Sequence, residues 1–548
     1  MMLTTSAKSS NTFNNLEQQN VHQRQQQKAL QSQLDTTGKE VRGEDTRSAD
    51  NMHSYVDTPS CKLITNIIID KDPEIPSWYP LQRIADEAKG HCMNAHNIKV
   101  AIITLQNKLI GSGYITSRVN LPDQNINSGN LELKVIAGKV GEIYLSEKSD
   151  TWVTTRNAFP MSSDDILDLR DIEQGLENMQ NIPSTYVHIN LVPTAEQGVS
   201  DVSIDRAQDA YWRVAGWMDD AGSKYTGRYQ GGLALYLDNI TSLNDLFYVS
   251  VGKSLQNNRH KGNKNSSMSY SVPYGYWSLN LYASQNEYHQ PLSGELSNYQ
   301  YQGKSKYLSA RVNRVLHRSA RQKTTFSSQV IKRDSNYYIS DTELELQRLD
   351  LTNLRFDLAH RHYIRDMVFD ADLSWQKNMR WFGSETTASA RYGNASDSSH
   401  IMTLDLQAAI PFQFAGIGMS YQPHFFSQYA PGQLISQDQF SIGNRWTIRG
   451  FDGENTLMGD RGWYLSNTVN INLPESWSNQ FYLGADVGQV SRTRQDWISG
   501  RTLMGGVAGV RGYKWHTGYD LFTSVPLSKP DGLATNDLNL GFTLQWMY

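Results

Sequence analysis

From residue 208 to the end of the chain, apolar and polar residues alternate with a period of two. In 354–358, Leu, Phe and Leu alternate with Arg and Asp, and 538–548 continues the same pattern. Such alternation indicates β-strands with one apolar and one polar face. A soluble sandwich also shows it, but with an aliphatic buried face and shorter strands. Charged residues in mid-strand are instead typical of the water-filled lumen of a membrane barrel, whose strands span the bilayer with about ten tilted residues.

Sixteen segments of this kind are expected, an even number, as bacterial barrels require. They cover 208–218, 228–238, 244–254, 273–283, 304–314, 321–332, 336–348, 351–361, 366–377, 398–409, 411–422, 463–473, 481–490, 502–512, 516–526 and 537–548. The predicted fold class is therefore all-β: a transmembrane barrel of sixteen antiparallel strands over residues 208–548.

The residues before 208 alternate helical and strand patterns. We expect two α+β domains, at 60–137 and 138–207, each with a helix followed by two strands. In the second domain the apolar residues of 164–179 fall on one face of a helix, which Ser162 or Ser163 can cap. Two consecutive units of the same order indicate a tandem of one domain type.

The first sixty residues are polar. Segment 11–34 contains eight glutamines and favours helix, but its apolar residues are too sparse for a packed face. By itself it is compatible with a polar helix or with a disordered tail. Residues 35–59 are charged and without period, as in a flexible linker. Because Met1 to Ser10 lack an apolar core, we expect an exported chain to have lost its signal peptide already.

Composition excludes several classes of protein. Lys and Arg total 51 against 55 for Asp and Glu, which gives a net charge of −4 and no basic surface for nucleic acid. No stretch approaches 18 apolar residues, so a membrane-spanning helix is not expected. Of the 58 aromatic residues, 9 precede residue 208 and 49 follow it. Aromatic enrichment without long apolar runs is what the interface girdles of a membrane barrel require.

No catalytic motif was found. Gly252-Lys253-Ser254 and Gly303-Lys304-Ser305 end like phosphate-binding loops, but both lack the glycine five residues earlier. His360 and His362 lie on one strand face, where lumen polarity explains them better than a metal does. We therefore expect neither an enzyme nor a cofactor nor a metal site.

One stretch carries a family resemblance. Residues 438–451 and 459–462 resemble the inward-folded sixth loop of the Omp85 superfamily, and specifically the two-partner secretion (TpsB) transporters, including the CdiB type. The loop tip of that family is Val-Arg-Gly-Tyr/Phe. Two places match it, 448–451 and 510–513. The resemblance implies five further strands after the loop, and only 449–548 is long enough for them. Arg449, Gly450 and Phe451 are thus the expected tip, in a loop near 430–462, and Arg511 is expected within a strand.

Other motifs extend the resemblance over most of the chain. Residues 113–118 and 170–177 resemble the family's two POTRA domains, and 11–34 matches its N-terminal plug helix. The partner motif Phe-x-Asp-x-Gly is similar to 484–488, with Asp486 and Gly488 in place and Gly484 where Phe is usual. An ion pair between Arg449 and Asp486 is expected, since guanidinium can grip a carboxylate with two hydrogen bonds. The alternative is that Arg449 faces lumen water.

The resemblance implies an outer-membrane transporter with its POTRA domains in the periplasm. The domains would capture one large unfolded exoprotein, a contact-dependent inhibition toxin, haemolysin or adhesin, for passage through the barrel. Membrane lipids and, during biogenesis, the barrel-assembly machinery are the other expected partners, and a monomer is expected. A barrel-assembly insertase, which often carries five POTRA domains, and a passive porin are the alternatives.

The chain has two cysteines, Cys61 and Cys92. They flank the first helix of the first α+β domain. In an oxidising periplasm they can form a disulfide, and two free buried thiols are the alternative.

Overall fold

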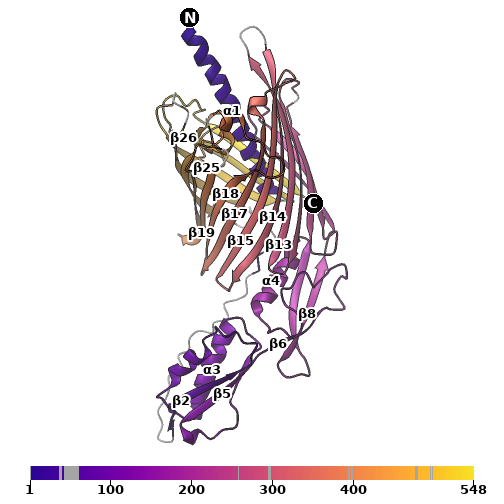
Figure 1. Ribbon diagram of the computed structural model, residues 1–548, viewed down its shortest axis with the longest axis vertical. Helices are drawn as coiled ribbons and strands as arrows, with labels where there is room; N and C mark the ends of the chain where they lie inside the picture. The colour runs from indigo at the N-terminus through magenta and orange to yellow at the C-terminus, as the bar shows by residue number, and fades with distance from the viewer. Residues whose placement is uncertain are drawn as a thin grey trace.

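The computed structural model describes residues 2–35, 40–41, 61–256, 258–293, 298–392, 395–396, 399–474, 479–493, 495 and 498–548. Figure 1 shows a barrel with two small domains stacked below one end. The N-terminal helix α1 (Met2–Leu34) runs through the barrel, and the N-terminus lies beyond the end opposite the domains. Within the described chain, no helix combines the length and hydropathy that a bilayer-spanning helix needs.

The first domain packs two helices on a small sheet. Its sheet has the order β2-β5-β4, with β2 and β5 parallel. Helix α3 begins after Asn94, whose side chain accepts a hydrogen bond from the backbone N–H of Asn97. The apolar face of α3 covers the alternating buried residues of β5. The elements are β1 (Lys62–Leu63), β2 (Asn66–Lys71), α2 (Leu81–Ala85), η1 (Asp86–Ala88), β3 (Cys92–Met93), α3 (Ala95–Gly111), β4 (Arg118–Asn120), η2 (Ile126–Ser128) and β5 (Asn130–Ile136).

The second domain repeats the scheme with one helix on a sheet of order β6-β8-β7. Its elements are β6 (Lys139–Leu145), α4 (Leu169–Gln180), β7 (Thr185–Pro193) and β8 (Val199–Gln208). The expectation that the helix starts near 164 was wrong. Asp168 rather than a serine is the N-cap, and its carboxylate accepts from the backbone N–H of Arg170 at 2.8 Å. A carboxylate at this position satisfies a free N–H and complements the helix dipole.

The barrel is closed and antiparallel, because the first strand pairs with both the second and the last. Its sixteen main strands are β9 (Trp212–Asp219), β10 (Gln230–Asp238), β11 (Leu246–Ser254), β12 (Gly262–Tyr274), β13 (Trp277–Ser293), β14 (Asn298–Arg318), β15 (Gln322–Ile339), β17 (Leu349–Ile364), β18 (Met367–Met379), β19 (His400–Phe414), β20 (Ile417–Tyr429), β23 (Arg461–Asn472), β24 (Asn479–Ser491), β25 (Thr502–Lys514), β26 (Thr517–Ser528) and β27 (Asn539–Met547). Shorter elements in the connections are β16 (Thr342–Glu343), η3 (Glu345–Gln347), α5 (Ala388–Arg391), η4 (Ser436–Asp438), β21 (Phe440–Ile442) and β22 (Leu457–Gly459).

The sixteen-stranded barrel is thus confirmed, although two segments were assigned wrongly. Residues 336–348 are not a separate strand, because β15 continues to Ile339 and a short hairpin follows it. The strand over 262–274 was missed, since its first half is polar on both faces and shows no alternation. The two errors cancel in the count.

The second domain docks on the short turns at one end of the barrel. Asn178 of α4 donates to the carbonyl of Gly275, in the β12–β13 turn, at 2.8 Å. Arg318, at the end of β14, is buried against α4 and pairs with Glu173 at 3.4 Å and Glu177 at 2.8 Å. Tyr276 donates to Asp171 at 2.5 Å. Polar groups from both sides are thereby matched, which holds the domain directly under the barrel opening.

Candidate functional site: helix, inward loop and barrel wall

The connection between β20 and β23 folds into the barrel rather than away from it. Its hairpin β21–β22 packs against the inner wall in an apolar cluster, in which Ile448 and Phe451 are buried on either side of the loop tip. The cluster consists of Phe440, Ile442, Ile448, Phe451, Leu457, Tyr464, Val490, Leu503 and Leu533. Burial of these side chains fixes the loop, because a full-size apolar side chain gains about 1.5–3 kcal/mol on leaving water.

The guanidinium of Arg449 grips Asp486 on the opposing wall. Nε donates to Oδ2 at 2.8 Å and Nη2 to Oδ1 at 2.6 Å, so the ion pair is bidentate. The backbone N–H of Arg449 adds a third bond to Oδ2 at 2.9 Å. The Asp486 side chain is completely buried and that of Arg449 is 19% exposed. Removing either partner would leave a buried charge uncompensated, which typically costs about 3–5 kcal/mol.

Glycines make room for this contact. Gly450 has φ +126°, a conformation that other residues rarely adopt. A Cβ on Gly505, the residue opposite Asp486 on β25, would lie 1.7 Å from the Arg449 carbonyl oxygen. A Cβ on Gly484 would lie 2.6 Å from Nη2 of Arg449, and one on Gly488 would lie 3.0 Å from Ile448. The glycine at 484, where the family pattern has Phe, therefore leaves space for the guanidinium to reach the Asn467 carbonyl at 3.3 Å.

The other arginine considered for the tip lies elsewhere. Arg511 is a residue of β25, and its guanidinium donates to Asn470 at 2.6 Å and to Gln480 at 3.3 Å. It faces neighbouring strands and takes no part in the loop contact.

Helix α1 lies inside the barrel and begins earlier than the expected residue 11, at Met2. Its glutamines bond to the β9–β10 connection and to the inward loop. Gln19 donates to Ser223 at 2.9 Å and Gln23 to Thr226 at 3.2 Å, while Gln25 donates to the Ser441 carbonyl at 3.4 Å. At its end, Tyr236 donates to the Leu34 carbonyl at 3.0 Å. A helix that is polar on all sides suits this place, because a polar lumen surrounds it. Most of the expected linker, 35–59, lies outside the described residues.

Asp438 joins helix, loop and wall at one point. It lies at the end of η4 and is 4% exposed. The two terminal guanidinium nitrogens of Arg333, on β15, donate to its carboxylate at 2.7 and 3.0 Å. Arg24 of α1 donates to the same carboxylate at 3.0 Å. The sequence pattern alone did not indicate this group of three charged residues. The available signal was Arg24, the one arginine in a glutamine-rich segment that otherwise contains only two charged residues.

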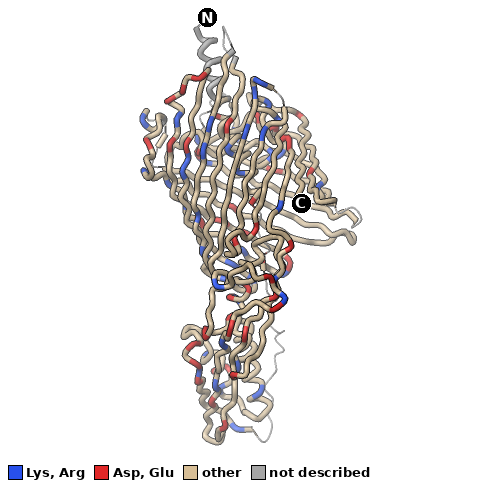
Figure 2. The backbone as a smooth tube through the Cα atoms, turned by 90° about the vertical axis from the view of Figure 1, so that its right-hand side faces the viewer, with Lys and Arg blue, Asp and Glu red and all other residues tan. Residues whose placement is uncertain are grey.

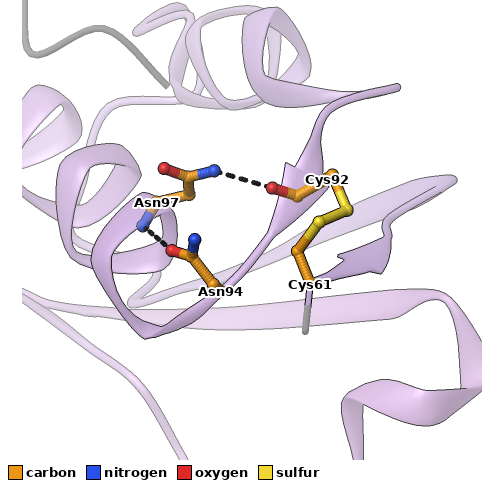
Figure 3. The surroundings of a disulfide bond; sticks show 4 residues. All are labelled: Cys61, Cys92, Asn94 and Asn97. Carbon is orange, nitrogen blue, oxygen red and sulfur yellow. Dashed lines mark hydrogen bonds between the residues drawn. A yellow bond between two sulfur atoms is a disulfide. The ribbon is translucent and has the colours of Figure 1, made fainter. Parts of the chain in front are cut away.

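Cys61, directly before β1, and Cys92 of β3 form a disulfide, with the Cα atoms 5.3 Å apart (Figure 3). Asn97 at the start of α3 donates to the Cys92 carbonyl at 2.6 Å. The bond thus ties the N-terminal edge of the first domain to the start of its long helix.

In the part of the chain that the structure describes, neither charged side chains nor possible metal ligands are concentrated at one place. Acidic and basic residues are interspersed over the barrel and the domains (Figure 2). The rings of His360 and His362 stack with centroids 5.9 Å apart, and His360 Nδ1 hydrogen-bonds Thr324 at 2.8 Å. Within the described ranges, no three His, Cys, Asp or Glu side chains gather in a way that could hold a metal ion.

Comparison with known proteins agrees with this architecture. Residues 198–512 match the family model of the haemolysin secretion/activation proteins ShlB/FhaC/HecB. Residues 63–138 match the ShlB-type POTRA domain, and 139–193 match a second POTRA model.

Individual relatives are similar over most of their length. The chain is 32% identical over 462 residues to the outer membrane transporter CdiB-2 of Burkholderia pseudomallei, which covers 83% of this chain and 78% of the relative. It is 28% identical over 418 residues to the hemolysin transporter protein ShlB of Serratia marcescens, covering 74% and 72%. The solved structure of CdiB from Acinetobacter baumannii superposes with a TM-score of 0.83 at 27% identity, covering 97% of this chain and 99% of that one. The chain therefore belongs to the ShlB/FhaC/HecB family of outer-membrane transporters, which carry out two-partner secretion.

Proposed function

We propose that the exoprotein exported by this chain is of the contact-dependent inhibition type, and that the structure represents the closed, resting transporter. The likeness to a CdiB transporter at 32% identity supports the first part. The bidentate contact of Arg449 with Asp486, beside a helix in the lumen, supports the second. For secretion, both the inward loop and helix α1 have to move out of the lumen, while the strands of the barrel wall stay paired.

Cargo class is tested by co-expressing the transporter with the exoprotein encoded beside it. Growth arrest of neighbouring cells on contact, dependent on the transporter, is the expected result. Haemolysis or adhesion without growth arrest would assign a different cargo. The conductance of the transporter without residues 1–34, described in the Discussion, tests the resting state separately.

We further propose that the capture edge is β7 of the second domain. An extended chain adds to a sheet where backbone groups are unpaired. In the first domain Gln82 bonds the N–H of Ile69 and the carbonyl of Ile67 on the β2 edge. Gln106 does the same for Val119 N–H and Ser117 carbonyl beside β4. These edges are therefore occupied by side chains of their own domain.

The β7 edge is less covered. Gln180 bonds the outward carbonyl of Val187, and by the strand alternation Ile189 and Leu191 present the next outward groups. Among the described residues, no side chain bonds these next groups. The exposed His188 side chain lies on the solvent face of the same strand. A photo-crosslinker at His188 should capture secreting exoprotein, whereas one at the exposed Ile68 of β2 should not. Equal capture at both positions would contradict the choice of β7.

A further inference from the structure

The outer surface of β11–β15 carries a hollow that neither the loop nor the helix explains. It has a volume of about 600 Å³ and lies on the lipid-facing side of the barrel. Strand register places its residues in rows that run across the strands, because paired residues on neighbouring strands share a face. The lowest row of the hollow is Val249, Met268, Ala283 and Leu308.

The next row up is Val251, Ser266, Gln285 and Lys306. Leu308 is 57% and Met268 51% exposed, as expected of side chains that contact lipid. The hollow forms because Ser266 and Ala283 are small, while Val251 and Leu308 stand on either side of them. An apolar depression of this shape fits a hydrocarbon chain.

Lys306 lines the hollow, and three further lysines lie in the row directly above it. The third row is Lys253, Lys264, Glu287 and Lys304, and Lys306 lies just below it. Lys332 has a partner in Asp350. In the described part of the chain, none of Lys253, Lys264, Lys304 and Lys306 forms an ion pair. Lys253 and Lys264 are directly opposite one another, an arrangement that repels unless an anion lies between or above the two ammonium groups.

The height of these lysines matches the outer leaflet. At the periplasmic end, the row Tyr274, Trp277 and Arg314 forms an interfacial girdle, in which Arg314 lies 4.8 Å from the Trp277 ring. From Tyr274 to Lys264 is ten residues, or roughly 33 Å of strand at about 3.3 Å per residue. With a tilt near 45°, the vertical separation is about 23 Å, close to the apolar band of about 25 Å in such barrels. The lysines therefore lie at the level of lipid headgroups.

We propose that this hollow, formed by the two lower rows, together with the row of lysines directly above it, binds the phosphorylated glycolipid of the outer leaflet, lipopolysaccharide, through its lipid A part. One acyl chain occupies the apolar floor, and phosphate oxygens contact Lys264, Lys304 and Lys306. Lysine serves as a point charge for phosphate. In the two upper rows and the adjoining β15, four lysines stand against Glu287 and Asp334, which leaves an excess of positive charge for the anion.

The experiment uses the full-length transporter in nanodiscs and native mass spectrometry. The probes are diphosphorylated lipid A and the same lipid without phosphates. The wild-type protein should retain the phosphorylated form at least about tenfold more tightly, a difference of about 1.4 kcal/mol. The triple variant Lys264→Gln, Lys304→Gln, Lys306→Gln should lose this preference. Lys514→Gln, at an exposed lysine of the periplasmic end, is the matched control and should keep it.

A second variant tests the hollow without changing charge. Ala283→Phe fills the floor and should weaken retention of the phosphorylated lipid, which keeps the proposal testable even if the triple variant does not assemble. Equal retention of both lipids by the wild type, or unchanged retention by the triple variant, would overturn the proposal. So would cross-links showing that a second copy of the chain covers β11–β15.

Discussion

At the scale of single residues, one buried carboxylate holds the tip of the inward loop against the barrel wall. Asp486 accepts three bonds from Arg449, two of them from a planar guanidinium fork that lysine cannot supply. The pairing also needs empty space, which Gly484 and Gly505 provide. The contact therefore depends both on the bidentate hydrogen bonds and on the absence of side chains at Gly484 and Gly505.

We expect Arg449→Ala to reduce exoprotein secretion strongly while the barrel still assembles. Asp486→Ala should do the same, and the double variant should be little worse than either single one, because coupled residues are non-additive. Secretion assays with immunoblots of outer-membrane fractions measure both quantities. Fully additive losses of secretion in the double variant, or normal secretion by Arg449→Lys, would argue against a bidentate ion pair between Arg449 and Asp486.

Adjacent glycines on β25 provide a steric test. Gly505→Ala would place Cβ 1.7 Å from the Arg449 carbonyl oxygen and should displace the loop tip. Gly506→Ala points the other way and meets its nearest atom, on Leu527, at 3.5 Å. Single-channel recordings should show a more open or noisier channel for the first variant and wild-type behaviour for the second. Identical recordings would mean that the tip accommodates the methyl group.

At the scale of elements, α1 is held by many separate polar contacts and by two small apolar clusters, around Leu16 and around Leu34. Each neutral hydrogen bond contributes only about 0.5–1.5 kcal/mol, so we expect that the helix can leave stepwise without unfolding of the wall. The contact of Arg24 with Asp438 links that release to the loop, because Asp438 also binds Arg333.

Deletion of residues 1–34 should increase the conductance of the reconstituted transporter. The physical reason is that the lumen loses helix α1, which runs through it. Planar-bilayer recordings measure the effect, and Arg24→Gln should give a smaller increase in the same direction. A conductance unchanged by the deletion would mean that the loop alone closes the channel.

Docking of the second POTRA domain should depend on pH. Burial of Asp171 raises the pKa of its carboxyl from 3.8 to about 6, although the bond from Tyr276 opposes this shift. Since the docked state binds the proton more tightly, this contribution is fully present below about pH 4 and is lost as the pH rises through about 6. Amide protection of α4, corrected for intrinsic exchange, should therefore fall over this range.

Asp171→Asn should remove that pH dependence, since the amide does not titrate. Asp123→Asn, at an exposed position of the first domain, serves as the control and should leave it intact. An unchanged pH profile for Asp171→Asn would assign the effect to another group.

At the scale of the whole molecule, the POTRA domains lie at one end of the barrel, and the inward loop enters the barrel from the other end. The turns at Gly275 and Arg318 contact α4, so this end faces the periplasm. Protease added to intact cells should therefore spare residues 61–205 and cut them only after permeabilisation, as followed by mass spectrometry. Cleavage within this range on intact cells would invert the topology.

The sequence by itself determined the architecture. A period of two over 340 residues, with charges in mid-strand, is compatible with few structures other than a lumen-containing barrel, and the remaining chain length assigned the loop tip to Arg449 rather than Arg511. The alternation of apolar and polar residues did not predict the strands correctly in two places. It missed β12, which is polar on both faces in its first half, and it divided off residues 336–348, although β15 continues to Ile339.

Only the tertiary structure decided how distant segments meet. Arg24, Arg333 and Asp438 are separated by up to 414 residues, and no local pattern relates them. The role of Gly505 depends on how closely the loop approaches the wall, a distance that alternation does not encode. The rows of lysines above the lipid-facing hollow likewise follow from strand register, which is fixed by pairing across the whole barrel. Periodicity sets which face a side chain takes, whereas register and loop docking set which side chains meet.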